Sequence, residues 1–196
     1  MSITTVNEAT DELYRRVRDS GQTAHASVML SVLSDCQRLT NALYGGVLTD
    51  VTLVRVKQQS LYLYSAIASD VIRCVSVTYR GETLHRTNWK ELANFDPLWL
   101  RAVADTPRVW DMIGHNLLCI YPAPDVGSFK NVVVRYVPEL ADLSAGGTLA
   151  IPTQHVPPML DLAEHVLLWR HRTMVSVEGA NAALERHSHV RVVDPL

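Results

Sequence analysis

Eight histidines, some of them close to carboxylates, are the residues of this sequence that could do metal chemistry. Asp161 and His165 are four residues apart, so a helix would place both on one face. The histidines that follow them are His171, His187 and His189. There is no H-E-x-x-H motif, the spacing that supplies two zinc ligands and a general base from one helix. Surface or interface histidines are therefore the favoured interpretation, with a small metal-dependent hydrolase as an alternative.

No serine or cysteine is placed as a nucleophile by a recognisable turn. The Gly-x-Ser-x-Gly pattern is absent, and Ser128 follows Gly127 in a predicted loop. Cys119 falls within a predicted strand, where burial is the usual state of a cysteine. The two glycine-rich phosphate-binding patterns, G-x-x-x-x-G-K-[ST] and G-x-G-x-x-G, do not occur. We therefore expect no catalytic residue, no metal and no cofactor, and predict that the protein is not an enzyme.

The aromatic residues are more informative than the polar ones. Three of the four tryptophans, Trp89, Trp99 and Trp110, fall within residues 88–111. Tryptophan contributes strongly both to packing of helices on sheets and to the centres of protein interfaces. We expect a Trp-rich helical insertion whose tryptophans either pack on a sheet or contact another subunit.

Helices are predicted at both ends of the chain. Apolar residues recur at intervals of three and four over residues 6–19 and 24–44, and glycine follows each run. These two segments predict a helical hairpin within residues 6–44. Pro157-Pro158 begins a long C-terminal helix, predicted over residues 157–186.

Between residues 50 and 138 the apolar period changes to two, which predicts a central antiparallel β-sheet or sandwich of four to six strands. One strand is expected at 71–79. A turn at 57–60 is expected to pair the runs on either side of it. Segments 117–125 and 132–138 are expected to form a hairpin around a loop rich in proline and glycine.

These elements predict an α+β fold. A chain of 196 residues fits one domain, here residues 1–186, followed by an extended C-terminal arm at residues 187–196. The arm is rich in β-branched residues, which is unusual for a disordered tail. Its apolar residues, which have no partner in the predicted domain, are Val190, Val192, Val193 and Leu196.

Composition excludes several classes of protein. A net charge of -2 argues against nucleic-acid binding as the main function, because phosphate neutralisation needs clustered Lys and Arg. Arg15, Arg16 and Arg18 are better explained as a solvated helix face. The three cysteines are distant from one another, which fits a reducing cytoplasm. No apolar run approaches the ~20 residues that span a bilayer, so we expect a soluble protein with no membrane partner.

The order of several short motifs resembles the head-tail adaptor (neck or connector) proteins of tailed bacteriophages. The motifs are Trp89, Pro107-Arg-Val-Trp110, Gly114-His-Asn-Leu-Leu-Cys-Ile-Tyr-Pro-Ala-Pro124, Val134-Arg-Tyr-Val-Pro-Glu139 and Ile151-Pro152. The resemblance covers roughly residues 25 to 180.

This resemblance implies a structural virion protein of the neck, assembled in the host cytoplasm. It implies a homo-oligomeric ring, commonly a dodecamer, that completes the head after DNA packaging. Its partners would be the portal protein and a downstream tail or nozzle protein, with DNA passing through the ring without sequence-specific binding. The arm would dock on the portal or on a neighbour through Val190, Val192 and Val193. Another neck or tail completion (stopper) protein remains an alternative.

Overall fold

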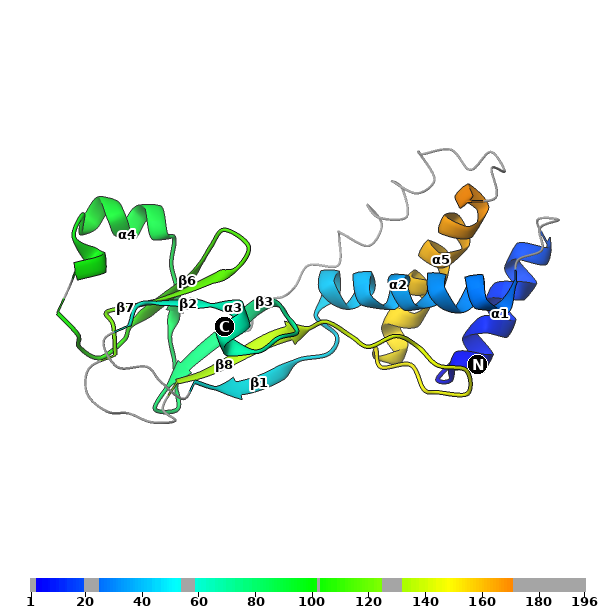
Figure 1. The fold of residues 1–196 in the computed structure, drawn as a ribbon, viewed down its shortest axis with the longest axis horizontal. Coiled ribbons are helices and arrows are strands. Elements are labelled where there is room, and N and C mark those ends of the chain that lie inside the picture. The colour runs from blue at the N-terminus through cyan, green and yellow to red at the C-terminus, as the bar shows by residue number, and fades with distance from the viewer. Residues whose placement is uncertain (1–2, 20–24, 54–58, 102, 125–131, 171–196) are drawn as a thin grey trace. The chain divides into compact units, whose positions relative to one another are not determined.

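The computed structural model describes residues 3–19, 25–53, 59–101, 103–124 and 132–170 (Figure 1). They form two compact units, which we describe separately. The helical unit contains the described residues up to 47 and from 139 onward, and the sheet unit contains those between 48 and 138. The predicted α+β class is confirmed.

The helical unit consists of three long helices and one short 3-10 helix. They are α1 (Val6–Asp19), α2 (Ala26–Tyr44), η2 (Thr153–His155) and α5 (Val156–Arg170). The predicted helix pair and C-terminal helix are confirmed over these ranges. Residues 171–186 of the predicted C-terminal helix, and the arm at 187–196, lie outside the described residues.

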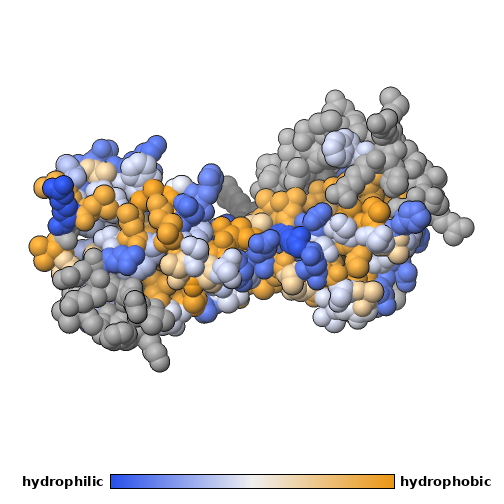
Figure 2. All heavy atoms as spheres, in the orientation of Figure 1, coloured by the Kyte–Doolittle hydropathy of each residue, from blue (hydrophilic) through white to orange (hydrophobic). Residues whose placement is uncertain are grey.

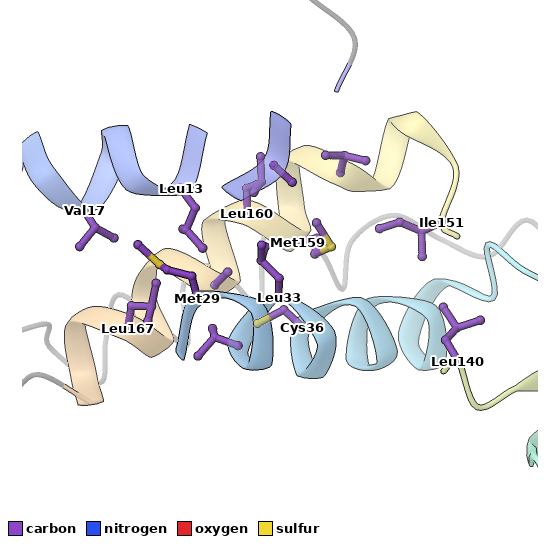
Figure 3. Packing of buried hydrophobic residues seen from close by; sticks show 14 residues of the cluster. Leu13, Val17, Met29, Leu33, Cys36, Leu140, Ile151, Met159, Leu160 and Leu167 are labelled. Carbon is purple, nitrogen blue, oxygen red and sulfur yellow. The ribbon is translucent and has the colours of Figure 1, made fainter. Parts of the chain in front are cut away.

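One continuous apolar core joins the three long helices (Figure 3). Leu13 of α1, Leu33 of α2 and Leu160 of α5 are each at most 1% exposed. The three-and-four spacing of apolar residues places them on one stripe of each helix, and the three stripes face one another. Burial of these stripes is the main stabilising contribution to the unit.

Three buried polar side chains of α2 fix two connections: Ser34 and Gln37 bind the segment that leads into α5, and Asn41 binds the segment that follows α2. Each accepts a hydrogen bond from a backbone N–H that would otherwise be buried without a partner. The pairs are Ser34 Oγ with Leu143 N (3.0 Å), Gln37 Oε1 with Ala150 N (2.9 Å) and Asn41 Oδ1 with Val47 N (2.8 Å). These contacts explain why polar residues occur on the buried side of α2.

Arg16 ties α1 to α5. Its guanidinium donates to Glu12 Oε1 at 2.9 Å within α1 and to Asp161 Oδ1 at 2.7 Å on α5. Arg15 also donates to Glu12, and the two guanidiniums lower the pKa of Glu12 to about 2. The cluster predicted as a solvated arginine face is therefore partly an ion-pair network between helices.

We expect Glu12→Gln to lower the free energy of unfolding by about 0.5–1 kcal/mol at pH 7, the usual range for a partly exposed pair. Since the carboxylate's pKa is lowered on folding, its contribution is full above the unfolded value near 4.5 and is lost as the pH falls toward about 2. The difference in unfolding free energy between Glu12→Gln and wild type should be clearly smaller at pH 3 than at pH 7. Urea unfolding of both proteins at pH 7 and pH 3 measures this difference, and Asp11→Asn on the same helix is the control. An equal difference in unfolding free energy between the variant and wild type at both pH values would contradict a stabilising ion pair at Glu12.

The sheet unit contains eight strands in two sheets, with orders β1-β8-β3-β4 and β2-β7-β6-β5. Neighbouring strands are antiparallel except β5 and β6, which are parallel. The strands are β1 (Thr49–Thr52), β2 (Leu61–Leu63), β3 (Val71–Tyr79), β4 (Glu82–Thr83), β5 (His85–Arg86), β6 (Val109–Ile113), β7 (Leu117–Tyr121) and β8 (Val132–Pro138). A single-turn helix, α3 (Tyr64–Ile67), follows β2. The predicted strand at 71–79 is confirmed.

The two sheets share one apolar core. Val77 and Val134 come from the first sheet, and Leu118 and Ile120 come from β7 of the second. Between the last two, Cys119 points to the opposite face of β7 and packs beneath helices. This alternation is the period of two expected of a strand, with both faces of β7 covered.

The predicted hairpin between 117–125 and 132–138 is wrong. β7 pairs with β2 and β6, whereas β8 pairs with β1 and β3 in the other sheet. β6 and β7 are joined by a tight turn at Gly114, whose φ of 64° suits glycine, so β7 already has two partners. The chain therefore crosses from one sheet to the other between β7 and β8.

The predicted turn at 57–60 is not seen to pair strands in the described residues. β1 pairs with β8, and β2 pairs with β7, so the two runs lie in different sheets. Residues 54–58 themselves lie outside the described residues. The expected all-antiparallel arrangement fails at β5 and β6, where His85 and Arg86 align in parallel with β6.

The helical insertion is confirmed over α4 (Trp89–Phe95) and η1 (Trp99–Arg101), which lie against the sheet that contains β6 and β7 (Figure 1). Asn88 caps α4 by accepting the backbone N–H of Lys90 at 2.9 Å. The insertion ends earlier than residue 111, because Trp110 lies within strand β6.

Candidate functional site

The described residues contain no group of three or more His, Cys, Asp and Glu side chains that could hold a metal ion. Asp161, one member of the predicted histidine and carboxylate set, forms an ion pair with Arg16. His165 is half-buried on α5, and its Nδ1 has no hydrogen-bond partner there. The other three histidines of that set lie outside the described residues.

The cysteines are not reactive groups. Cys36, Cys74 and Cys119 are buried and form no disulfide. Burial raises the pKa of Cys74 to about 11 and that of Cys119 to about 12. Since the thiolate is the nucleophile, both thiols are unreactive at neutral pH.

Of the three predicted tryptophans, Trp99 packs the insertion on the sheet, whereas Trp110 lies in the core that the two sheets share. Trp110 is 2% exposed, and the guanidinium of Arg86 lies 5.5 Å from its ring centroid. Trp99 is 7% exposed and meets the ring of Tyr121 edge-on at 6.5 Å. Trp89 is half-buried, and its backbone N–H donates to Asp111 Oδ2 at 2.8 Å. The structure thus places the side chains of Trp99 and Trp110 inside the subunit.

A second hydrogen bond fastens the end of α4 to the sheet. The hydroxyl of Tyr121 donates to Asp96 Oδ2 at 2.9 Å, and this bond raises the pKa of Tyr121. The other oxygen of Asp96 accepts the backbone N–H of Leu98 at 3.0 Å, which begins the turn into η1. Beyond the other end of this segment, the backbone N–H of Asp105 donates to Ala123 O at 2.9 Å. The segment that carries the exposed residues described next is therefore anchored at both of its ends.

Four apolar side chains of this anchored segment face outward, and we call them the insertion patch. They are Phe95 (88% exposed), Leu98 (65%), Leu100 (57%) and Val103 (88%). Figure 2 shows that apolar residues, in orange, reach the surface of the protein. Clustered exposed apolar residues mark interaction surfaces in soluble proteins. These exposed positions were not among the predicted site residues, although residues 92–103 hold more apolar side chains than one short helix can bury.

Two open hollows lie beside the insertion patch. One, of about 560 Å³, has both apolar and charged walls, and the other, of about 440 Å³, lies beside Leu100 and Val103. The walls of the first include Leu92, Phe95, Val109, Pro122, Glu91 and Arg108. Protruding side chains with hollows beside them allow shape complementarity with a protein partner.

A second exposed apolar surface lies on the helical unit. Leu39 and Leu43, one turn apart on α2, are 43% and 47% exposed, and we call this pair the α2 stripe. Asp35 precedes Leu39 by one turn, with its side chain 54% exposed. The opposite side of α2 faces the core, so the α2 stripe is the outward face of this helix.

No helix of the described residues is both long and apolar enough to cross a membrane. No curated protein matches the chain. The model of the SU10 adaptor protein family matches residues 3–187, nearly the whole sequence. That range contains both units and the segment of the insertion patch. The chain therefore belongs to the SU10 adaptor protein family, a structural family of phage head-tail adaptors.

Proposed function

We propose that the protein is a structural component of the virion neck that forms a ring between the portal and the tail and completes the head after DNA packaging. The observation that carries this proposal is the family match over residues 3–187. The exposed insertion patch and α2 stripe support it, because an isolated subunit leaves apolar surface uncovered.

The proposed ring contains twelve copies and contacts the portal protein on one side and a tail or nozzle protein on the other. Copies related by rotation about the ring axis meet through two different surfaces, because a heterologous contact repeats until the ring closes. DNA would pass through the ring without sequence-specific binding, in keeping with a net charge of -2.

The C-terminal arm at residues 187–196 is proposed to dock on the portal or on a neighbouring subunit. Val190, Val192 and Val193 suit an added β-strand, since their β-branched side chains favour extended backbone. The sheet unit offers a strand edge, because β4 pairs with only Thr78 and Tyr79 of β3 in the described residues. An edge of this kind can accept a strand from another chain.

Deleting residues 187–196 is expected to leave a folded subunit that does not join filled heads to tails. The experiment supplies either the full chain or the shortened chain to a phage that lacks the gene, and counts tailed particles by electron microscopy. A thermal midpoint equal to wild type controls for folding. Unchanged yield of tailed particles would remove the arm proposal, and intact virions that contain none of this protein would overturn the adaptor proposal itself.

A further inference from the structure

We propose that the helical insertion is a lid that opens and closes by itself while the two sheets stay folded. The insertion lid comprises α4 and η1, residues 89–101, and it closes over strand β7. A hydrogen bond between Asp96 and Tyr121 is the latch of the closed state. The lid carries Phe95, Leu98 and Leu100, so its opening moves most of the insertion patch relative to the sheets. This inference goes beyond the proposed function and does not depend on the ring.

The first argument is the small buried core beneath the lid. α4 buries Leu92, η1 buries Trp99, and both belong to one cluster with Cys119 of β7. This cluster is separate from the core that the two sheets share. A segment held by few buried apolar contacts opens at a lower cost in free energy than the larger core beside it. The lid is therefore expected to open before the sheets unfold.

The second argument is the hydrogen bonding of the lid backbone. These bonds close locally, as between Asp96 N and Leu92 O at 2.8 Å and between Trp99 N and Asp96 O at 3.0 Å. The ladder between β6 and β7 contains no residue of the lid. Opening of the lid therefore requires no strand pairing to break.

The third argument is the way in which the two ends of the insertion are fixed. Just before the lid, the backbone N–H of Thr87 donates to Trp110 O at 2.9 Å. Beyond the lid, the backbone N–H of Asp105 donates to Ala123 O at 2.9 Å. These two bonds keep both ends on the sheet, and the lid between them can turn about its ends.

The latch is a side-chain hydrogen bond that lies between these two ends. The hydroxyl of Tyr121 donates to Asp96 Oδ2 at 2.9 Å, and Asp96 follows the last residue of α4. The other oxygen of Asp96 accepts the backbone N–H of Leu98 and so begins the turn into η1. The bond from Trp89 N to Asp111 lies at the N-terminal end of the lid, beside the fixed end. Loss of the latch therefore frees the C-terminal end of α4 together with η1.

The three native cysteines provide the test, because each lies in a different buried cluster. Cys119 lies under the lid, Cys74 lies in the core that the sheets share, and Cys36 lies in the core of the helical unit. The purified full chain is treated with iodoacetamide over a range of urea concentrations at constant pH. Mass spectrometry gives the initial rate of alkylation at each cysteine, and each rate is divided by that of the same cysteine in the unfolded chain.

Without urea, Cys119 is expected to react at least about tenfold faster than Cys74, because a local opening is more populated than unfolding of the sheets. The rate at Cys119 should rise only weakly with urea until the sheets unfold, since opening of the lid exposes little surface. A smaller ratio of the two rates, or an equally steep dependence on urea, would overturn the inference.

Tyr121→Phe removes the latch hydroxyl and keeps the aromatic ring. This variant is expected to speed alkylation of Cys119 about fivefold, the effect of losing one hydrogen bond, and to leave the rate at Cys74 unchanged. Tyr136→Phe is the matched control, because that hydroxyl also donates to a carboxylate, Asp70 Oδ1 at 3.0 Å, from β8 of the other sheet. In the control, Cys119 should keep its wild-type rate.

No acceleration at Cys119 in Tyr121→Phe, or equal acceleration at Cys119 and Cys74, would overturn the assignment of the latch. The wild-type rates decide whether the lid opens by itself, independently of how well this variant folds.

Discussion

Replacing Trp110 with alanine is expected to lower the free energy of unfolding by about 3–5 kcal/mol. Trp110 is 2% exposed and belongs to the core that the two sheets share. Its removal loses the transfer free energy of the ring and leaves a cavity that packed strands cannot fill. Since domains are stable by only about 5–15 kcal/mol, this loss is a large part of the total.

Urea denaturation followed by far-ultraviolet circular dichroism measures the effect on Trp110→Ala. Trp169→Ala is the matched control, because Trp169 is 68% exposed and its replacement should change the free energy of unfolding by no more than about 0.5 kcal/mol. Similar small effects for both variants would show that Trp110 does not hold the two sheets together.

Introducing two carboxylates into the insertion patch is expected to abolish assembly without unfolding the subunit. In the variant Phe95→Asp with Leu98→Asp, both changes fall on exposed positions, so the thermal midpoint should stay close to wild type. At a subunit contact the same carboxylates would be desolvated at a cost of several kcal/mol. A cost of about 3 kcal/mol corresponds to about a 100-fold loss of association at each contact.

The readout is the amount of the protein in purified particles, measured by quantitative mass spectrometry, together with the phage titre. Phe95→Leu with Leu98→Met is the control, because it keeps the patch apolar and should assemble normally. Wild-type incorporation of the double aspartate variant would show that the insertion patch stays in solvent within the virion.

The long helices and the longest strand could be predicted largely from periodicity. The first helix was expected at residues 6–19 and is observed as Val6–Asp19, and strand β3 matches its expected range of 71–79. Both segments bury one regular face against a core, which leaves a clear three-and-four or alternating pattern in the sequence.

Strand partners could not be predicted in the same way. Alternation along β7 and β8 shows which side chains face inward, but it does not show which strand supplies the hydrogen bonds. Leu118 and Val134 look alike in the sequence, yet they reach the shared core from opposite sheets. The connection between them was expected to be a hairpin loop, although it passes from one layer to the other.

The candidate surfaces were only partly visible in the sequence. Tryptophans marked the segment that carries the insertion patch, but Trp99 and Trp110 are buried, and the exposed positions belong to Phe95 and Val103. Which apolar residue of a short irregular segment faces the sheet depends on tertiary contacts such as the Tyr121 hydroxyl bond to Asp96. The arm residues Val190, Val192, Val193 and Leu196 stay a prediction, since they lie outside the described residues.

Cryo-electron microscopy of the neck in intact virions is the most direct test of the adaptor ring. We expect a closed ring of this chain between portal and tail, in which the insertion patch of each copy is covered by a neighbouring protein. A neck in which this protein is absent, or in which its copies do not touch one another, would contradict the account.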